Sequence, residues 1–356
     1  MSTNTEASAS PAASALAPHF PKPIFITGAS GYVGRNLVRH FLAAGTDVIG
    51  LTRSEKGAQL LRELGATPVV ADIVSTDLVE AMRGCGALVH AAANTDHGLS
   101  TEVQQKTNQE GTRRVFQAAR QAGIGRAVHI SSESVLADGR PIVNADESWP
   151  LPRRPAGGYS RSKAAAEKAA LSFNSTEFSV MVVRPRFVWG RDDTTALPFL
   201  VQAARSGQMA WINGGTYLTS TTHIANLCVG IELALVKGSG GEVYFITDGA
   251  PVEFRSFISQ VLETQGVAVP EKSVPRALLR TIARIGDALG TLSAGKIAAP
   301  LTMQSYATSA VEVTLDINKA STQLGYFPGF SREAGLAELR EQADQARQAA
   351  SQAQRE

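Results

Sequence analysis

Apolar runs and helix-like repeats follow one another along the first half of the chain. Short apolar runs bounded by glycine or polar residues predict buried strands, and they occupy 24–26, 47–51, 67–70, 87–90, 127–130 and 179–183. Between them, apolar residues recur at i and i+4, as Val33, Leu37 and Phe41 do, which predicts amphipathic helices. The helices are expected from residue 33 onward and over 58–64, 76–83, 101–122 and 159–173. This alternation predicts a doubly wound parallel α/β sheet covered on both faces.

The rhythm changes after Gly190, where helices predominate. Helical patterns are expected over 196–206, 224–236, 253–265 and 274–290, with a break at 217–222 and one short strand at 243–246. We interpret this half as a smaller, mostly helical substrate-binding cap over the carboxyl edge of the sheet. The expected parts are a disordered tail (1–20), a sheet domain (21–190) with a loop at 137–158, a cap interleaved with the last sheet strands (191–335), and a terminal helix and tail fraying into solvent (336–356).

Composition and charge exclude several classes of protein. With 44% hydrophobic and 19% charged residues and a net charge of +2, the chain has too little charge to favour nucleic acid or an acidic membrane as a partner. The first 20 residues lack the basic start and continuous apolar core of a signal peptide, so we expect neither a signal peptide there nor a membrane span. The cysteines, Cys85 and Cys228, match no metal spacing, so we expect buried, reduced thiols, no metal site and a cytoplasmic protein.

A glycine-rich turn, Thr27–Gly34, joins the first strand to the first helix. Its spacing is Gly-x-x-Gly-x-x-Gly. A strand, a glycine turn and a helix together place a phosphate at a helix N-terminus, where free N–H groups and the helix dipole favour an anion. A strand-to-helix turn without a ligand is the alternative. The predicted contacts of a dinucleotide's pyrophosphate are Gly28, Gly31, Tyr32, Val33 and Gly34.

The end of the second strand bears on which dinucleotide is bound. An NAD site usually has an acidic residue there that accepts from the ribose hydroxyls. This chain has Thr52 and Arg53 instead, with Lys56 close behind. A guanidinium pairs with a 2′-phosphate, which an acid would repel. We therefore expect NADP in preference to NAD, the alternative being a solvated arginine in a loop.

Two further strand ends are expected to contact the cofactor. Asp72 and Ile73 follow the third strand, where a carboxylate accepts from the adenine amino group and an aliphatic chain covers the ring. Asp72 is equally suited to be the N-cap of the next helix. Ala91, Ala92 and Ala93 follow the fourth strand and leave room for a ligand, although small residues for packing would look the same.

The fifth strand ends in Ser131-Ser132, and Tyr159 and Lys163 come later as an i, i+4 pair on one helix face. A free phenol has a pKa near 10, too high for proton transfer at neutral pH, and a neighbouring ammonium lowers it. A serine hydroxyl opposite the phenol would hold a substrate oxygen while a nicotinamide exchanges a hydride with its carbon. A Tyr-x-x-x-Lys pair alone is common in helices. It indicates a catalytic site here only because it follows a strand that ends in two serines, in a chain that begins with the glycine turn.

Together these residues resemble the extended branch of the short-chain dehydrogenase/reductase superfamily, the NAD-dependent epimerase/dehydratase family, with its Rossmann-type sheet. The resemblance rests on 27–34, 72–73, 90–93, 108–112, 130–132, 159–163 and 184–190. Later segments resemble its 3β-hydroxysteroid dehydrogenase-like group, namely 222–227, 244–249 and 324–328. Steroid-acting relatives in animals usually carry a membrane-anchoring segment. None is evident here, which favours a soluble bacterial-type reductase.

The resemblance assigns roles by position. Tyr159 would be the general acid/base, Lys163 would bind the nicotinamide ribose, and the catalytic serine falls on Ser132 in preference to Ser131. Further roles are implied for other residues: Pro185 and Val188 beside the nicotinamide, Asn108 as a structural polar residue, and His223 as a packed or capping residue of the cap.

The resulting hypothesis is an NADP-dependent oxidoreductase that interconverts a ketone and a secondary alcohol. The aromatic residues Phe187, Trp189, Phe199 and Trp211 suggest a small, apolar substrate. The main alternative is a nucleotide-sugar epimerase or dehydratase with tightly bound NAD. A non-catalytic NADP sensor is a third reading, against which the intact Ser132, Tyr159 and Lys163 argue. A homodimer formed through helices 101–122 and 159–173 is common in the resembled family.

Overall fold

A computed structural model describes residues 22–96, 102–293 and 301–353. Its centre is a seven-stranded sheet in the order β12-β7-β5-β4-β1-β2-β3, with every neighbouring pair parallel. The strands are β1 (Ile24–Thr27), β2 (Val48–Thr52), β3 (Thr67–Val70), β4 (Ala87–His90), β5 (Arg126–Ile130), β7 (Ser179–Pro185) and β12 (Val243–Ile246). The predicted parallel sheet is confirmed, including the short strand at 243–246. The strand order reverses between β1 and β4, the place where such sheets bind ligands.

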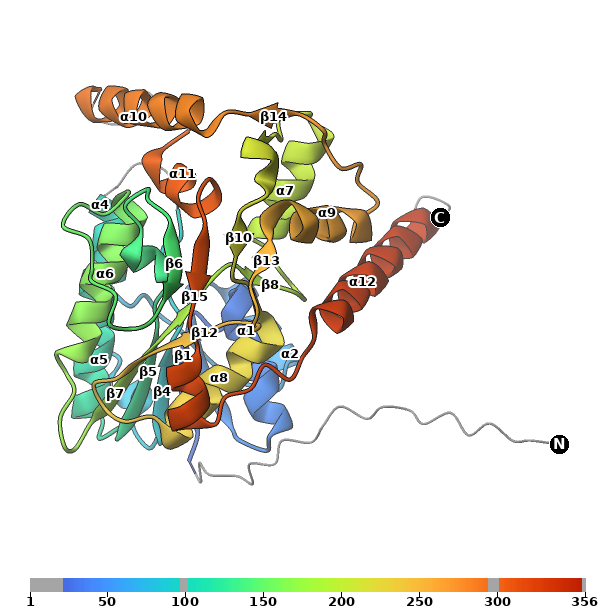
Figure 1. Cartoon of the computed structure of the whole chain (residues 1–356). Coiled ribbons are helices and arrows are strands. Elements are labelled where there is room, and N and C mark those ends of the chain that lie inside the picture. Colours follow the sequence, from blue (N-terminus) through green and yellow to red (C-terminus); the bar gives the residue numbers. More distant parts are fainter. Residues whose placement is uncertain (1–21, 97–101, 294–300, 354–356) are drawn as a thin grey trace.

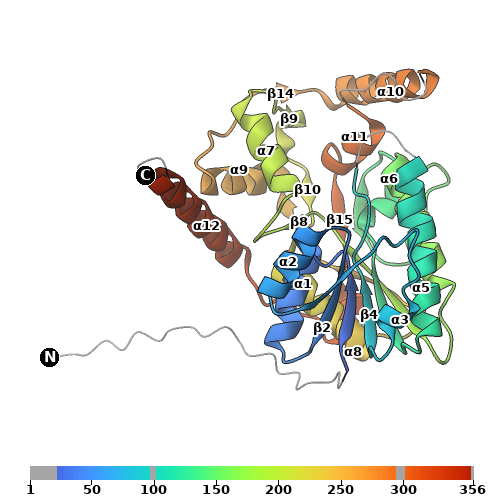
Figure 2. The ribbon, with the colours of Figure 1, turned by 180° about the vertical axis from the view of Figure 1, so that it is seen from behind.

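Helices cover both faces of the sheet (Figures 1 and 2). One face packs on α1 (Tyr32–Ala43), α2 (Glu55–Glu63) and α8 (Ile224–Lys237), through a core that includes Phe41, Leu61 and Ile231. The other face packs on α3 (Val79–Met82), α5 (Thr112–Gln121) and α6 (Gly158–Leu171), through Met82, Phe116 and Ala170. All six of these side chains are buried. Burial on both faces explains why the strands are apolar throughout.

The helix expected over 101–122 is interrupted. It consists of α4 (Glu102–Gln105), a π-helical segment (Lys106–Gly111) and α5. At Gly111 an added Cβ would lie 2.7 Å from Ile73 Cδ1, so the segment approaches the sheet more closely than a larger residue would allow. Sequence periodicity does not reveal this change of winding, because the π-helical segment spans only Lys106–Gly111.

The cap contains more strand than expected. A second sheet has the order β13-β10-β15-β6, with β6 (Ile142–Ala145), β10 (Leu218–Thr219), β13 (Val252–Glu253) and β15 (Val313–Leu315). Strand β6 lies inside the segment 137–158, which we expected to be a loop. Two small sheets pair β8 (Val188–Trp189) with β11 (Thr222–His223) and β9 (Trp211–Ile212) with β14 (Ser273–Val274). The cap helices are α7 (Ala196–Arg205), α9 (Phe254–Thr264), α10 (Arg276–Leu292) and α11 (Met303–Ser309).

The last helix, α12 (Arg332–Ala353), starts before the expected boundary at residue 336. Its first turns are packed: Leu339 is buried in the cap core with α9, and a Cβ on Gly335 would meet the Trp189 ring at 2.6 Å. The following turns are exposed. The expected fraying therefore does not apply to the first turns of the helix.

Other expectations concern what lies around these elements. The tail 1–20 falls outside the described residues. Cys85 and Cys228 are free and buried, as predicted. Among the described helices, none has both the length and the apolar character needed to cross a membrane.

Candidate active site

The glycine turn between β1 and α1 is closely packed. Gly28 has φ +65°, and a Cβ there would lie 2.9 Å from the backbone of Ala92 at the end of β4. A Cβ on Gly34 would lie 2.1 Å from the carbonyl oxygen of Gly28. Any larger residue would push the turn away from helix and sheet. At Gly28 and Gly34 the turn therefore presents only its backbone at the place where the strand order reverses.

The N-terminus of α1 suits an anion. Gly31, its N-cap, has no side chain to occupy the first N–H groups, and the first turn carries no acidic residue. Tyr32 is buried, its hydroxyl has no hydrogen-bond partner among the described residues, and burial raises its pKa well above the ordinary value. Val33 is half-buried beside the core. These residues fit the pyrophosphate of a dinucleotide, held by backbone donors.

The end of β2 separates two predicted residues by exposure. Thr52 is buried, and its hydroxyl bonds the hydroxyl of Ser30 in the glycine turn at 2.8 Å. Arg53 is exposed, and within the described residues its guanidinium has no ion-pair or hydrogen-bond partner. Ser54 caps α2 by accepting from the N–H of Gly57. Arg53 is thus a free cation beside the glycine turn.

At the end of β3, Asp72 closes a local turn. Its carboxylate accepts from the N–H of Val74 at 2.7 Å. The N-cap alternative is wrong, because α3 starts at Val79 with Leu78 as its N-cap. Ile73 is buried in the core against Gly111. Ala91, Ala92 and Ala93 are half-buried at the end of β4, and the Ala92 N–H donates to the Thr27 hydroxyl.

The structure brings Ser132, Tyr159 and Lys163 together. Tyr159 lies in the first turn of α6, and the Ser132 hydroxyl is close enough to act on the Tyr159 pKa. Lys163 lies one turn later and donates from Nζ to the carbonyl oxygen of Ile130, the last residue of β5, at 2.7 Å. Tyr159 and Lys163 are both buried. The strand end and the first turns of α6 therefore hold all three side chains in one place.

The pKa of Tyr159 differs from our expectation. Burial raises it above its ordinary value, the Glu133 carboxylate raises it further, and the nearby Ser132 hydroxyl opposes both. Burial also lowers the pKa of Lys163 to about 8, against the attraction of Glu167. The expected lowering of the phenol pKa is therefore wrong, because desolvation of the buried hydroxyl exceeds the effect of neighbouring groups.

Two buried ion pairs, missed by the sequence analysis, surround the two serines. Ser132 Oγ donates to Glu133 Oε2 at 2.7 Å, and Arg186 Nη1 donates to Glu133 Oε1 at 2.8 Å. Ser131 Oγ donates to Glu167 Oε2 at 2.7 Å, and Arg184 Nε donates to the same oxygen at 2.9 Å. Ser131 is thus bonded to Glu167, which lies two turns along α6 from Tyr159. Ser132 lies beside Tyr159 itself. Two arginines in the apolar stretch 180–186 were the available signal.

A residue far along the chain supports α6. Gln304 of α11 is buried, and its Oε1 accepts from the N–H of Ser160, the residue after Tyr159, at 3.0 Å. Asn108 accepts from the N–H of Asn94 at 2.7 Å and donates to the hydroxyl of Ser162 at 3.0 Å. The expected structural role of Asn108 therefore has a physical basis, since it joins α6 to the segment after β4.

The remaining predicted residues lie where the sheet meets the cap. Pro185 is buried at the end of β7, and Val188 is half-buried in β8. His223 caps α8, accepting from the Ala225 N–H at 3.2 Å, and stacks on Phe330 with ring centres 4.3 Å apart. His223 is thus a packed and capping residue, as the sequence analysis expected.

The aromatic residues expected to line the substrate site divide into two kinds. Trp189 and Trp211 are buried in the cap core, and each indole N–H is bonded internally, to Asp248 and to the Pro270 carbonyl. They are structural residues. Phe199 is 70% exposed on α7, and Phe187 is half-buried.

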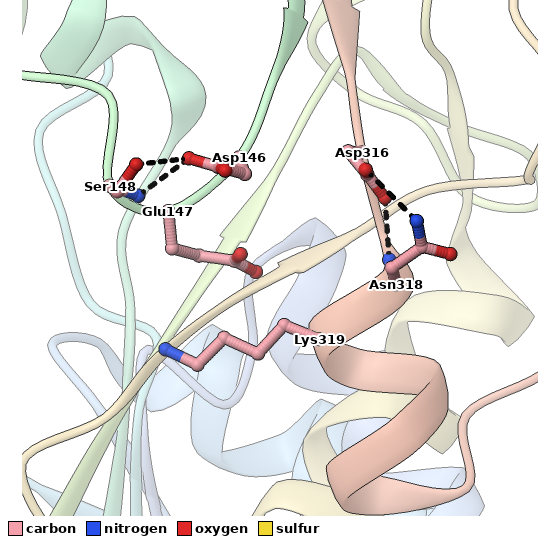
Figure 3. A pocket seen from close by; sticks show the side chains of 6 residues that line it. All are labelled: Asp146, Glu147, Ser148, Asp316, Asn318 and Lys319. Atoms are coloured by element: carbon pink, nitrogen blue, oxygen red, sulfur yellow. Dashed lines mark hydrogen bonds between the residues drawn. The ribbon is translucent and has the colours of Figure 1, made fainter.

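A surface pocket between the β6 and β15 ends is shown in Figure 3. Asp146 and Asp316 there accept from groups two residues later, Ser148 and Asn318. Lys319 pairs with Glu242, with Nζ and Oε2 2.6 Å apart. None of the predicted site residues lines this pocket, so it is separate from the candidate active site.

Comparison with known proteins agrees with this arrangement. Residues 25–276 match the model of the 3-beta hydroxysteroid dehydrogenase/isomerase family. The chain is 46% identical over 318 residues to 4-hydroxy-2-methyl-3-oxo-4-farnesyl-3,4-dihydroquinoline-1-oxide ketoreductase from Stigmatella aurantiaca, covering 89% of this chain and 95% of that protein. It is 31% identical over 328 residues to a decarboxylating sterol-4-alpha-carboxylate 3-dehydrogenase from Dictyostelium discoideum, covering 89% and 100%.

Solved structures share the fold. A dTDP-glucose 4,6-dehydratase from Streptomyces venezuelae with NAD bound has a TM-score of 0.70 and 24% identity, covering 89% of this chain and 95% of that chain. The sheet, the glycine turn and the family match support one another. The chain belongs to the 3-beta hydroxysteroid dehydrogenase/isomerase family of extended short-chain dehydrogenases and is an NAD(P)-dependent oxidoreductase acting on CH–OH groups.

Proposed function

We propose that this protein is an NADP-dependent ketoreductase that uses Ser132, Tyr159 and Lys163. The observation that carries the proposal is the juxtaposition of the three side chains: Ser132 lies close enough to Tyr159 to act on its pKa, and buried Lys163 lies one turn behind with its Nζ on the Ile130 carbonyl. Ser132 follows the carboxyl end of β5, and the bond from Lys163 to the Ile130 carbonyl holds α6 at the same edge of the sheet, where the glycine turn also lies. Proton transfer groups and cofactor site thus share one edge of the sheet.

The side chains divide the chemistry between them. A bound nicotinamide supplies a hydride to the carbonyl carbon, or takes one from the alcohol. In reduction, the C=O π electrons move to oxygen, and Tyr159 gives its proton to that oxygen. Ser132 donates a hydrogen bond to the same oxygen, in place of its present bond to Glu133. The ammonium of Lys163 stabilises the phenolate left on Tyr159, which regains its proton from solvent.

The preference for NADP rests on the end of β2. Arg53 is an exposed cation with no partner among the described residues, and Lys56 is exposed nearby. A 2′-phosphate offers two or more oxygens to a guanidinium. The two residues that follow β2, Arg53 and Ser54, are not acidic, and the next residue, Glu55, is paired with Arg62. Asp72 and Ile73 are the proposed adenine contacts, and Pro185 and Val188 the proposed nicotinamide contacts.

An apolar ketone is the proposed substrate class. The first relative is named as a ketoreductase of a farnesylated quinoline oxide and the second as a sterol dehydrogenase, and both match nearly the whole chain. Exposed Phe199 and half-buried Phe187 of the cap agree with an apolar substrate. A cytoplasmic location and a homodimer through α5 and α6 stay predictions.

The test is a turnover assay that separates this function from the epimerase or dehydratase alternative. The purified chain is given NADPH or NADH with polycyclic and prenylated ketones, and separately UDP-glucose or dTDP-glucose with NAD. We expect one NADPH oxidised per ketone reduced, faster than with NADH, and no change in the sugars. Sugar conversion without net oxidation of cofactor, by protein purified with NAD attached, would overturn the proposal.

A further inference from the structure

Glu133 is a buried carboxylate next to the proposed catalytic serine. It begins the short 3-10 helix (Glu133–Leu136) that follows β5, and it is only 6% exposed. Its Oε2 accepts from the Ser132 hydroxyl at 2.7 Å, and its Oε1 accepts from Arg186 Nη1 at 2.8 Å. The proposed proton and hydride transfers use neither Glu133 nor Arg186. Burying a carboxylate is nevertheless costly, which suggests that this charge has a function at the site.

Arg186 holds the Glu133 carboxylate in place. Its side chain is only 2% exposed, and its second terminal nitrogen, Nη2, donates to the Thr308 carbonyl of α11 at 2.6 Å. The main chain of Arg186 is held as well, because its N–H donates to the Thr222 hydroxyl at 3.1 Å. A buried carboxylate that is paired with a fixed cation stays charged. Glu133 therefore keeps a fixed negative charge at the catalytic end of the site.

The Ser132 hydroxyl is engaged both as a donor and as an acceptor. Its hydrogen is donated to Glu133, and its oxygen accepts from the N–H of Ser134 at 3.1 Å. A hydroxyl has a single hydrogen. A phenolate on Tyr159 would be stabilised by a hydrogen bond donated from Ser132, and Glu133 competes for that hydrogen. The bond between Ser132 and Glu133 therefore favours the protonated phenol.

Other ionisable groups at this end of the site do not cancel the charge of Glu133. They lie on α6, on the strands beside it and after β7, and they are Lys163, Glu167, Arg184, Arg186, His90 and His129. Glu167 pairs with Arg184, and the Lys163 ammonium donates to the Ile130 carbonyl. Burial, with the Lys163 charge, lowers the pKa of His90 to about 3 and that of His129 well below its ordinary value, so both rings are neutral.

The elements that pack on α6 from the other side add little charge. Helix α11 has no charged residue, and Glu102 of α4 and Lys106 of the π-helical segment are exposed to solvent. Apart from burial, the Glu133 carboxylate is the group that raises the pKa of the Tyr159 phenol. The geometry and the charge of Glu133 thus act on Tyr159 in the same direction.

We propose that Glu133, held by Arg186, is a positioning residue that favours ketone reduction over alcohol oxidation near neutral pH. This role presupposes the proposed ketoreductase function. In reduction, Tyr159 gives its proton to the substrate oxygen while the carbonyl carbon receives a hydride from the cofactor, so the phenol must start protonated. In oxidation, a Tyr159 phenolate takes the alcohol proton while the hydride returns to the cofactor. A fixed negative charge beside Tyr159 assists the first reaction and opposes the second.

The experiment measures kcat against pH for ketone reduction with NADPH and for oxidation of the product alcohol with NADP. The double variant Glu133→Gln/Arg186→Met removes both charges, so neither is left buried alone, and the glutamine oxygen can still accept from Ser132. Glu133→Asp keeps the charge. Glu232→Gln is the matched control, because Glu232 is a buried carboxylate, paired with His40 at 2.6 Å, on the opposite face of the sheet from α6. Cofactor-induced thermal shift checks that each variant folds.

In the double variant, we expect the pH at which alcohol oxidation reaches half its maximal kcat to fall by about one unit or more, as for the loss of a neighbouring charge. The pH above which ketone reduction declines should fall with it. Glu133→Asp and Glu232→Gln should keep the native midpoints.

Two results would overturn the role of Glu133 and leave the proposed function intact. One is ketone turnover with the same midpoints in the native chain and the double variant. The other is a midpoint shift in Glu133→Asp or Glu232→Gln as large as that in the double variant. Failure of the native chain to reduce any ketone would overturn the proposed function and the role of Glu133 together.

Discussion

The two ends of the candidate site differ in the exposure and pairing of their charged side chains. At the nucleotide end, after β2, Arg53 is exposed and has no partner within the described residues. At the catalytic end, after β5 and β7, Glu133 pairs with Arg186 and Glu167 pairs with Arg184, and all four side chains are buried. One end keeps a cation open to solvent, and the other satisfies its charges internally.

The difference follows from what each end has to do. A cofactor phosphate carries negative charge. An exposed guanidinium can therefore pair with it at a small cost in desolvation. A proton-transfer group must be held in one place, and a buried carboxylate requires a partner to stay charged. Glu133 and Glu167 each hold a serine hydroxyl, so the ion pairs position the groups around Tyr159.

The largest effect should come from the catalytic end. Tyr159→Phe removes the proposed proton donor and keeps the ring, so we expect kcat to fall about 10²- to 10⁴-fold, the usual contribution of general acid–base catalysis. Cofactor affinity, measured by fluorescence titration, should change little. Ser131→Ala is the matched control, because Ser131 bonds Glu167 and lies away from the phenol. Retained turnover in Tyr159→Phe would remove Tyr159 from the mechanism.

A change at the nucleotide end should have an intermediate effect and should act on binding. Arg53→Ala removes the open cation, and we expect the Kd for NADPH to rise about 10- to 100-fold, as for a lost hydrogen bond to a charged group. The Kd for NADH should stay nearly constant, and so should kcat at saturating cofactor. An equal loss for both cofactors would show that Arg53 does not face the 2′-phosphate.

A third effect concerns stability instead of activity or binding, and comes from Lys163. Its pKa falls from 10.5 to about 8 on burial, so between these pH values the unfolded chain binds more protons than the folded one. Stability should therefore rise with pH across this range, by on the order of 1 kcal/mol for each pKa unit. Lys163→Met lacks this group, so its melting temperature should rise less from pH 8 to 10 than that of the native chain. Parallel melting curves for the two proteins would contradict the lowered pKa.

The sequence was informative where structure is periodic. Every strand of the central sheet was predicted, because the inner strands are buried on both faces and read as apolar runs, and the edge strand β3 is a short apolar run bounded by polar residues. Strands β10 and β13 of the cap sheet are only two residues long, which leaves no period to detect. Strand β6 was missed because its partner is β15, with Ile142 opposite Val313. No local sequence pattern predicts a pairing between such distant segments.

The site shows the same division. Tyr159 and Lys163 were predicted from their spacing on one helix face, and Ser132 was preferred to Ser131 through the family resemblance. The structure brings the three residues together. Their supports were not predicted. Gln304 reaches Ser160 from α11, and Arg186 reaches Glu133 from the segment after β7. Such partners are fixed by tertiary packing, which also decided that burial would raise the Tyr159 pKa.

The pairing of β6 with β15 has a consequence for biosynthesis. A chain emerging from the ribosome could complete the glycine turn and the first strands early, since their contacts are local. The support that Gln304 gives to α6, and the partner of β6, become available only after residue 313 has been made. Nascent chains should therefore bind the cofactor well before they can catalyse turnover. Chains released early would bind the cofactor but would not catalyse the reaction.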